Sequence, residues 1–238
     1  MAHQTQGQVM VITGTSQGIG RAVAKYFAAK GYQVAGCSRG PATLKVKGYH
    51  HSQVDVGDGH QARAWVRKIK DEFGHIDVLV CNAGVVQSVL LMAVTPDDIL
   101  QKFLHTHVAG TYYVCREVAK VMLPQKYGRI ITVSSMWVPL HSEGTSAYSA
   151  TKSAVVEMTK ILAKELAPAG ITCNVFSPAL FMTDAAKAMG QEWAGRLLEK
   201  LTIKRTVSVE EVCNVISFFA APESGCIIGQ VINMGLVS

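Results

Sequence analysis

The sequence of 238 residues lacks the features that mark membrane, secreted or nucleic-acid-binding proteins. No apolar run approaches the roughly 18 residues that a membrane span needs, and the polar start MAHQTQGQ has no hydrophobic signal segment. The formal net charge is +6, but no basic run suggests a tail that binds nucleic acid. We therefore expect a cytoplasmic protein, with the mitochondrial matrix as the alternative, that binds neither a membrane nor nucleic acid.

The cysteines form no C-x-x-C pair, although the chain has six of them. Cys37, Cys81 and Cys173 lie in apolar runs, which favours buried thiols in a reducing compartment over a disulfide framework. We predict no metal site. Internal repeats, low-complexity tracts and linkers are also lacking, so we expect a single domain over residues 1–238.

What the sequence does contain is a regular alternation of short apolar runs and helical patterns, such as those at 20–31 and 60–74. Strands that are apolar throughout and alternate with helices predict an α/β protein, a doubly wound Rossmann fold with a parallel sheet and helices on both faces. Segment 39–51 is too short for a full crossover helix and should be a loop or a single turn. The seven expected strands are 9–13, 32–38, 51–56, 77–83, 128–135, 172–178 and 230–235.

A glycine-rich stretch, TGTSQGIG at 13–20, lies between the first strand and the first helix. Three glycines often mark nothing more than a loop. Between a strand and a helix, however, they allow a tight turn and a close backbone approach, and the helix N-terminus offers N–H groups to a pyrophosphate. This position favours dinucleotide binding. The residues expected to contact the dinucleotide are Gly14, Ser16, Gln17, Gly18, Ile19 and Gly20.

The end of the second strand reads Cys37-Ser38-Arg39, where an acidic residue would bind the ribose 2′-hydroxyl of NAD. Arg39 can instead form a forked contact with a 2′-phosphate, and Ser38 can donate a hydrogen bond to it. A solvated arginine at the start of a loop is the alternative. We favour NADP(H) as the cofactor.

Tyr148 and Lys152 are four residues apart at the start of a predicted helix, so they share one face. A nearby ammonium should lower the pKa of the phenol and make it a general acid–base. A packed tyrosine beside an exposed lysine would give the same spacing. However, Ser135 ends a strand thirteen residues before Tyr148, at the sheet edge where parallel sheets bind ligands. Its hydroxyl could hold a carbonyl oxygen while Tyr148 protonates it.

With these motifs together, the chain resembles the short-chain dehydrogenase/reductase family over essentially its whole length. Within that family it looks most similar to 3-oxoacyl-[acyl-carrier-protein] reductases and related small carbonyl reductases. The resemblance implies a dinucleotide-binding half at about 1–135 and a catalytic and lid region at about 135–238, with the lid at 180–206. The matching motifs are TGTSQGIG (13–20), Asp55-Val56, NAG (82–84), Ser135 and YSATK (148–152).

The resemblance also implies roles for individual residues. Tyr148 would donate the proton, Ser135 would orient the substrate carbonyl, and Lys152 would tune Tyr148 and bind the nicotinamide ribose. Asp55 and Val56 would flank the adenine. The remaining implied cofactor contacts are Asn82, Ala83 and Gly84 at the ribose, and Pro178 and Thr183 at the carboxamide.

Departures from the family pattern concern proton exchange and the substrate. His107 replaces the usual Asn that holds a water serving the lysine, and we hypothesise that its titration weakens reduction on acidification. The alternative is that His107 turns away and only caps local polar groups. Ala169 replaces one basic residue of a carrier docking site, whereas Lys126 keeps the other. Pro178-Ala179 and Asn233-Met234-Gly235 replace Pro-Gly and Asp-Gly-Gly.

We therefore expect NADPH-dependent reduction of a carbonyl, foremost a 3-oxoacyl thioester, with an acyl carrier protein as a possible partner. The alternatives are a reductase of another ketone or quinone and a non-catalytic nucleotide-binding subunit. We also expect a homotetramer, because the helices at 111–126 and 149–167 have more apolar positions than a single chain needs. These positions are Tyr112, Val114, Val118, Val121, Met122, Val155, Met158, Ile161 and Leu162.

Overall fold

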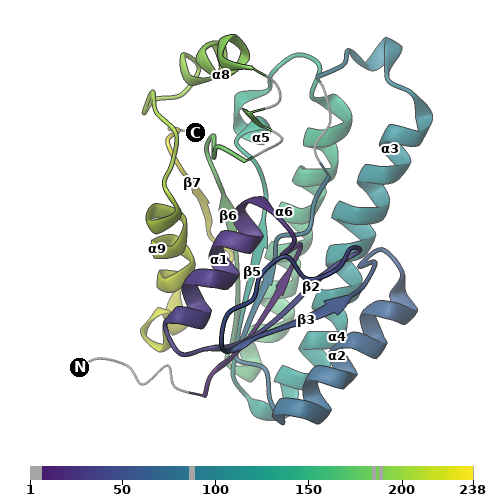
Figure 1. Cartoon of the computed structure of the whole chain (residues 1–238), viewed down its shortest axis with the longest axis vertical. Coiled ribbons are helices and arrows are strands. Elements are labelled where there is room, and N and C mark those ends of the chain that lie inside the picture. Colours follow the sequence, from purple (N-terminus) through teal and green to yellow (C-terminus); the bar gives the residue numbers. More distant parts are fainter. Residues whose placement is uncertain (1–6, 86–88, 184–185, 188–189, 238) are drawn as a thin grey trace.

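The computed structural model describes residues 7–85, 89–183, 186–187 and 190–237. One seven-stranded sheet, in which every neighbouring pair is parallel, runs through the molecule in the order β3-β2-β1-β4-β5-β6-β7. This confirms the predicted doubly wound architecture (Figure 1). The strands are β1 (Val9–Thr13), β2 (Gln33–Ser38), β3 (Tyr49–Gln53), β4 (Val78–Cys81), β5 (Gly128–Val133), β6 (Ile171–Ser177) and β7 (Val231–Asn233).

Helices cover both faces of the sheet, and α5 and α8 lie above the carboxyl ends of the strands (Figure 1). A π-helical turn, η2 (Leu104–Ala109), joins α3 directly to α4. The α-helices are α1 (Gly18–Ala29), α2 (Gly59–Phe73), α3 (Asp97–Phe103), α4 (Gly110–Gln125), α5 (Trp137–Leu140), α6 (Ser146–Leu166), α8 (Gln191–Leu198) and α9 (Val209–Ala220), and the 3₁₀ turns are η1 (Met92–Val94), η3 (Ala167–Ala169) and η4 (Pro222–Cys226).

The third strand lies earlier in the chain than its apolar pattern suggested. We expected residues 51–56, whereas β3 pairs with β2 from Tyr49, opposite Val34, to Gln53, opposite Ser38. The chain leaves the sheet after Gln53, so the apolar residues that follow lie in a loop at the sheet edge. The short link between β2 and β3 contains no helix, as expected.

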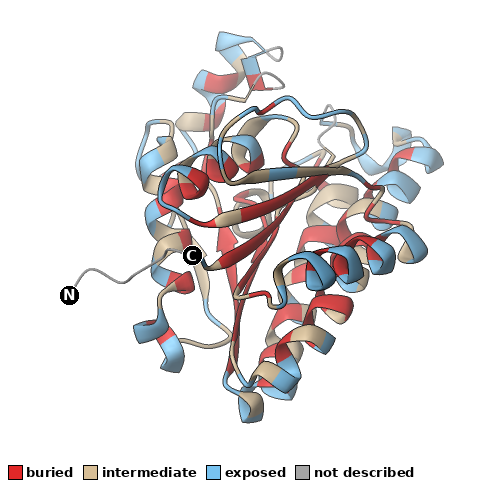
Figure 2. Cartoon of the chain, turned by 60° about the horizontal axis from the view of Figure 1, so that its bottom comes forward, coloured by how far each residue is buried: buried red, intermediate tan, exposed pale blue. Residues whose placement is uncertain are grey.

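The core forms two layers because successive strand residues point to opposite faces. In β1, Val9 and Val11 pack with α2, α4 and α6, whereas Met10 and Ile12 pack with α1 and α9. Figure 2 shows buried residues along the strands and on the inner helix faces, with exposed residues on the outer faces. This packing holds the carboxyl ends of the strands on a rigid base.

The cysteines are free thiols, and Cys226 is the exposed one. Cys37, Cys81, Cys115, Cys173 and Cys213 are buried. Among the described residues, no helix combines the length and apolar character needed to cross a bilayer. The same part of the chain contains no cluster of three or more His, Cys, Asp or Glu side chains arranged to bind a metal ion.

Candidate active site

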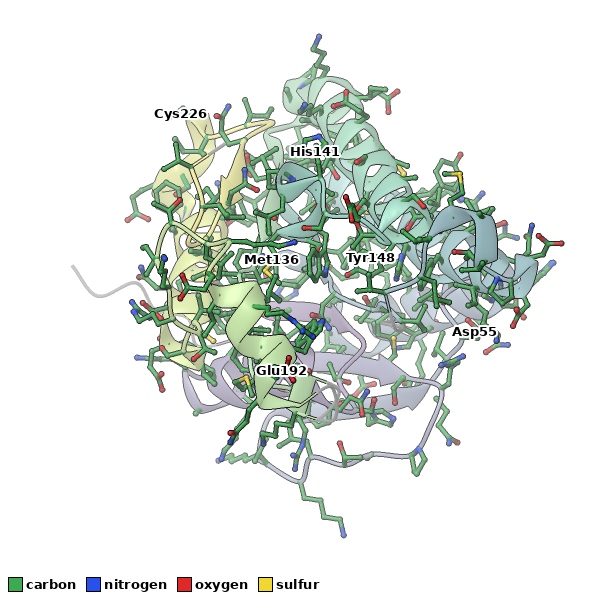
Figure 3. The ribbon with its side chains drawn as sticks, turned by 90° about the horizontal axis from the view of Figure 1, so that it is seen from above. Asp55, Met136, His141, Tyr148, Glu192 and Cys226 are labelled. Atoms are coloured by element: carbon green, nitrogen blue, oxygen red, sulfur yellow. The ribbon has the colours of Figure 1, made fainter. Side chains whose placement is uncertain are left out.

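A cleft of about 560 Å³ opens at the carboxyl ends of the strands and contains most of the predicted site residues, a volume typical of small-molecule sites. Figure 3 looks down on this edge, with Tyr148 and Met136 near the centre, α8 to one side and Asp55 to the other. His107 and Gly20 lie behind the wall. The predicted residues that line the cleft are Gly14, Ser16, Gln17, Gly18, Ile19, Ser38, Arg39, Asp55, Val56, Asn82, Ala83, Gly84, Ser135, Tyr148, Lys152, Pro178 and Thr183.

The glycine loop is held by the end of β4. The Asn82 side-chain amide donates to the carbonyl oxygens of Thr13 and Gly14 at 3.0 and 3.2 Å, and the Ala83 N–H donates to Thr13 Oγ1 at 2.9 Å. Gly14 has a φ of +75°, and a Cβ there would lie 2.8 Å from Ala83 Cα. A glycine is required because this contact leaves no room for a side chain. Gly20 is buried behind the loop, where a Cβ would lie 2.3 Å from both the Asn82 side-chain nitrogen and the Gly14 carbonyl oxygen.

The N-terminus of α1 faces the cleft without a capping side chain. Its N-cap residue, Gln17, makes no side-chain cap, and the first turn has no acidic residue. Helix α2 differs, because Asp58 accepts hydrogen bonds from the N–H groups of His60 and Gln61. The first N–H groups of α1 and the positive end of its dipole therefore fit an anionic group in the cleft.

At the far end of the cleft, the wall carries an exposed arginine and polar side chains that are held by hydrogen bonds. Arg39 is exposed on the wall, next to Ser38, whose hydroxyl donates to the Gly40 carbonyl at 3.0 Å. Asp55 is held in the loop after β3: one carboxylate oxygen accepts from the Gly57 N–H at 3.0 Å and the other lies 3.2 Å from His105 Nε2.

Ser135, Tyr148 and Lys152 come together as the sequence predicts. Tyr148 lies in the first turn of α6 and Lys152 one turn later, and the Ser135 side chain lies close enough to the phenol to lower its pKa. The Lys152 ammonium lies 6.0 Å from the centre of the Tyr148 ring and donates to the Val133 carbonyl at 2.9 Å. Lys152 is buried, whereas Tyr148 keeps some exposure to the cleft.

The pKa of Tyr148 differs from our expectation. We expected Lys152 to lower the phenol pKa, but burial raises the pKa of Tyr148 to about 12, and only the Ser135 hydrogen bond opposes that shift. Burial lowers the pKa of Lys152 to about 8. Removing charged forms from water dominates both shifts. Tyr148 therefore keeps its proton at neutral pH.

His107 is a fully buried part of the wall behind Gly84. Its Nε2 lies 3.0 Å from the Val85 nitrogen and 3.1 Å from the Val85 carbonyl oxygen, and its Nδ1 lies 2.9 Å from Thr151 Oγ1. Thr151 in turn donates to the Tyr148 carbonyl at 2.8 Å. If the single Thr151 proton goes to the Tyr148 carbonyl, Nδ1 carries the imidazole proton and Nε2 accepts from the Val85 N–H. Neutral His107 thus links the segment after β4 to the first turn of α6.

The hypothesis that His107 titrates near neutral pH is wrong. Burial, reinforced by the charge of Lys152, lowers the pKa of His107 to about 3. The imidazole is therefore neutral throughout the range in which we expected it to gain a proton. Its role is to hold two backbone segments together.

A pH–rate comparison of the wild type with His107→Asn tests this correction. We expect kcat/KM for carbonyl reduction to be flat from about pH 5.5 to 8 in both proteins, because neither His107 nor Tyr148 changes protonation there. Lys152, cationic below its pKa of about 8, loses its charge above it. Above pH 8 we expect kcat/KM to fall about tenfold per pH unit, as one essential proton is lost. An acid limb near pH 6 that is present in the wild type and absent in the variant would restore the original hypothesis.

The sequence did not reveal the aromatic side chains at the substrate end. Trp137 follows Ser135 by two residues, and Trp193 comes from α8; both line the cleft, and their ring centres are 6.5 Å apart. Phe181 and Met136 add apolar surface beside them. The closeness of Trp137 to Ser135 was a usable signal, whereas nothing in the local sequence of Trp193 indicates that it reaches Trp137.

Comparisons of the sequence with known proteins all point to one family. The family model described as short chain dehydrogenase matches residues 8–193. The chain is 29% identical to 3-oxoacyl-[acyl-carrier-protein] reductase FabG of Escherichia coli (strain K12), with 96% of each chain covered. It is 31% identical to FabG of Staphylococcus epidermidis (strain RP62A), with 94% of this chain and 96% of the relative covered.

Two solved structures have the same fold along nearly the whole chain. One is ElxO with NADP bound, with a TM-score of 0.89, 28% identity and coverage of 95% of this chain and 96% of ElxO. The other is a variant of actinorhodin polyketide ketoreductase with NADPH, with a TM-score of 0.89, 27% identity and coverage of 98% and 97%.

Proposed function

The chain belongs to the short-chain dehydrogenase family, and we propose that it uses NADP(H) to reduce a carbonyl to a secondary alcohol. The observation that carries this proposal is the cluster formed by Ser135, Tyr148 and Lys152. It lies in the wall of a cleft that also contains the glycine loop and Arg39. An acid group and a dinucleotide cradle in one cleft are what carbonyl reduction by a nicotinamide requires.

The residues of the cleft fit this cofactor. The uncapped N-terminus of α1 would hold the pyrophosphate, and Arg39 with Ser38 would bind the 2′-phosphate. Asp55 and Val56 would flank the adenine. Asn82 to Gly84 would line a ribose, and Pro178 and Thr183 would contact the carboxamide. Most of these contacts come from the half of the chain up to about residue 135, and Pro178 and Thr183 add contacts from the later half, which also holds the substrate end of the cleft.

The chemistry then divides between cofactor and protein. The bound nicotinamide supplies the hydride. Ser135 orients the substrate carbonyl, and Tyr148, whose pKa of about 12 keeps it protonated, donates a proton to the oxygen. Lys152 is cationic below pH 8, and its charge stabilises the phenolate that remains after the transfer.

A 3-oxoacyl thioester is our first candidate substrate, because the FabG relatives cover nearly the whole chain. The names of those relatives state that their 3-oxoacyl substrate is attached to an acyl carrier protein. Lys126, the remaining basic docking position, lies between α4 and β5, at the amino ends of the strands. Tyr148 lies at the opposite edge. A carrier docked at Lys126 would therefore deliver its acyl group to a neighbouring copy of the chain.

A second candidate is another ketone or quinone, and the Trp137–Trp193 pair favours it. The two indoles form an aromatic surface at the substrate end of the cleft, and Leu180 and Phe181 extend it. Flat rings gain stacking energy from such a surface beyond their simple burial. A thioester with a short acyl chain gains little from it.

A substrate panel tests these proposals. The loss of NADPH absorbance is followed with a 3-oxoacyl thioester, presented on carrier protein and on a small thiol, beside a quinone, a cyclic ketone and no substrate. We expect turnover with at least one carbonyl compound, with the thioester foremost. Quinone or ketone turnover at least tenfold faster would favour the second candidate. Tight NADPH binding without turnover on any substrate would favour a non-catalytic subunit.

We also propose a homotetramer, although fewer of the predicted apolar side chains are available for its interface than the sequence suggested. Much of the predicted apolar surface belongs to the chain's own core, because Val114, Val118, Met122 and Val155 are buried. Of the other predicted positions, Tyr112 and Ile161 are 49% and 58% exposed, whereas Val121, Met158 and Leu162 are half-buried. Leu123 on α4, which the sequence did not single out, adds an apolar side chain that is 43% exposed.

Light scattering tests this assembly. At micromolar concentration we expect a tetramer, because exposed apolar side chains on neighbouring helices are typical of an interface. Replacing Ile161 with Glu should shift the mass towards dimer or monomer. Ile203→Glu, which changes an apolar side chain that is similarly exposed outside this surface, is the matched control. A wild-type monomer would refute the proposal.

A further inference from the structure

A chain of hydrogen bonds runs beneath the cofactor cleft, from the glycine loop to the turn after β2. Thr15 Oγ1 lies 2.7 Å from the hydroxyl oxygen of Tyr49, which lies 2.9 Å from His51 Nδ1. His51 Nε2 in turn lies 3.0 Å from the carbonyl oxygen of Gly40. Gly40 follows Arg39, so the chain connects the two proposed phosphate-binding parts of the site.

The fold makes specific room for this chain. Tyr49 and His51 are two residues apart on β3 and therefore point to the same face. On the neighbouring strand, a Cβ at Gly36 would lie 2.6 Å from the Tyr49 hydroxyl oxygen and 2.7 Å from Thr15 Oγ1. The absent side chain at Gly36 lets the phenol cross β2 and reach Thr15.

The proton directions can be worked out from the available donors. With Nε2 of His51 donating to the Gly40 carbonyl, Nδ1 accepts from the Tyr49 hydroxyl. The Thr15 hydroxyl lies between two acceptors, the Tyr49 oxygen at 2.7 Å and the Cys37 carbonyl oxygen at 3.3 Å. Ser38 donates to the Gly40 carbonyl at 3.0 Å. Gly40 therefore accepts two hydrogen bonds, one from a residue that lines the cleft and one from a residue behind it.

The two hydrogen bonds to the Gly40 carbonyl allow Ser38 to bind a ligand without releasing the turn. If the Ser38 hydroxyl turns to a phosphate, the Gly40 carbonyl keeps its bond from His51, and the turn that carries Arg39 stays in place. If His51 is replaced and the Ser38 hydroxyl turns to the phosphate, the Gly40 carbonyl loses both of these hydrogen bonds. Fixing a binding loop in advance increases affinity, because less ordering remains to be done on binding.

We propose that His51 is a positioning residue for the 2′-phosphate of NADP(H), acting through Gly40 on the Ser38–Arg39 turn. This inference rests on the cofactor proposed above. It goes beyond that proposal in assigning part of the discrimination between NADPH and NADH to a residue that does not line the cleft. NADH has no phosphate to recruit Ser38, so its binding should not depend on His51.

The test compares the dissociation constants of NADPH and NADH between the wild type and three variants, each measured by fluorescence titration. His51→Leu should weaken NADPH binding about three- to tenfold and NADH binding less than twofold, the range expected for one neutral hydrogen bond. His51→Gln, which can still donate to Gly40, should recover most of the loss. Tyr49→Phe, which removes the donor to Nδ1, should cause a smaller loss confined to NADPH.

His50→Leu is the matched control. It changes the adjacent histidine on the same edge strand, whose imidazole contacts Gln33 and Glu72 instead of the turn. We expect its ratio of NADPH to NADH affinity to match the wild type. Equal losses for both cofactors in His51→Leu, or no loss, would overturn the inference while leaving NADP(H) as the cofactor. A wild type that does not prefer NADPH would overturn both.

Discussion

Replacing Tyr148 with Phe should lower kcat for carbonyl reduction by about 10²–10⁴-fold, the usual contribution of general acid catalysis. The substitution removes the phenolic hydroxyl that lines the cleft together with Ser135 and Lys152. The ring remains, so its edge-to-face contacts with Phe103 and His107 are kept. NADPH affinity should change little, because the glycine loop and the Arg39 turn are untouched.

The controls separate lost chemistry from lost structure. NADPH titration and thermal unfolding of Tyr148→Phe should resemble the wild type. Tyr26→Phe, at a partly buried tyrosine packed against Phe27 on α1 and absent from the cleft wall, should keep full activity. More than a tenth of wild-type turnover in Tyr148→Phe would show that another group donates the proton.

The sequence predicted those parts of the site that depend on short-range geometry. Gly14 and Gly18 had to lie where a strand meets a helix, and Tyr148 and Lys152 had to share a helix face. Both follow from spacing along one element. The parallel sheet followed in the same way from apolar runs that alternate with helices.

Burial reversed two of the electrostatic predictions. From spacing alone, Lys152 should lower the pKa of Tyr148, and His107 should titrate near neutrality. Spacing does not reveal how much protein surrounds a side chain. Once His107 is fully buried and Lys152 lies beside it, the charged imidazole becomes costly and its pKa falls to about 3.

Long-range pairing produced the features that the sequence left unseen. Tyr49 reaches Thr15 only because the register of β2 and β3 places its side chain over Gly36. In the same register β3 begins at Tyr49, earlier than the predicted start at residue 51. Trp193 meets Trp137 only because α8 folds over the strand ends. Such contacts join residues far apart in the sequence, so no local pattern indicates them.

Replacing Arg39 with Asp should weaken NADPH binding about 10- to 150-fold, which corresponds to the roughly 1.5–3 kcal/mol of a hydrogen bond to a charged group. Arg39 lies in the cleft wall directly after β2, and its guanidinium can fork onto a phosphate. The new carboxylate would repel that phosphate and could accept a hydrogen bond from the 2′-hydroxyl of NADH. NADH affinity should therefore hold or improve, and the preference should invert.

Arg67→Asp is the matched control for this inversion. It makes the same change in net charge on the exposed outer part of α2, where Arg67 pairs with Asp71 outside the cleft. We expect it to leave the NADPH-to-NADH ratio within about twofold of the wild type at physiological ionic strength, since exposed charges farther apart than about 8 Å are largely screened. If Arg67→Asp and Arg39→Asp lowered NADPH affinity equally, the preference would come from overall charge. A direct contact between Arg39 and the 2′-phosphate predicts that only Arg39→Asp changes the ratio.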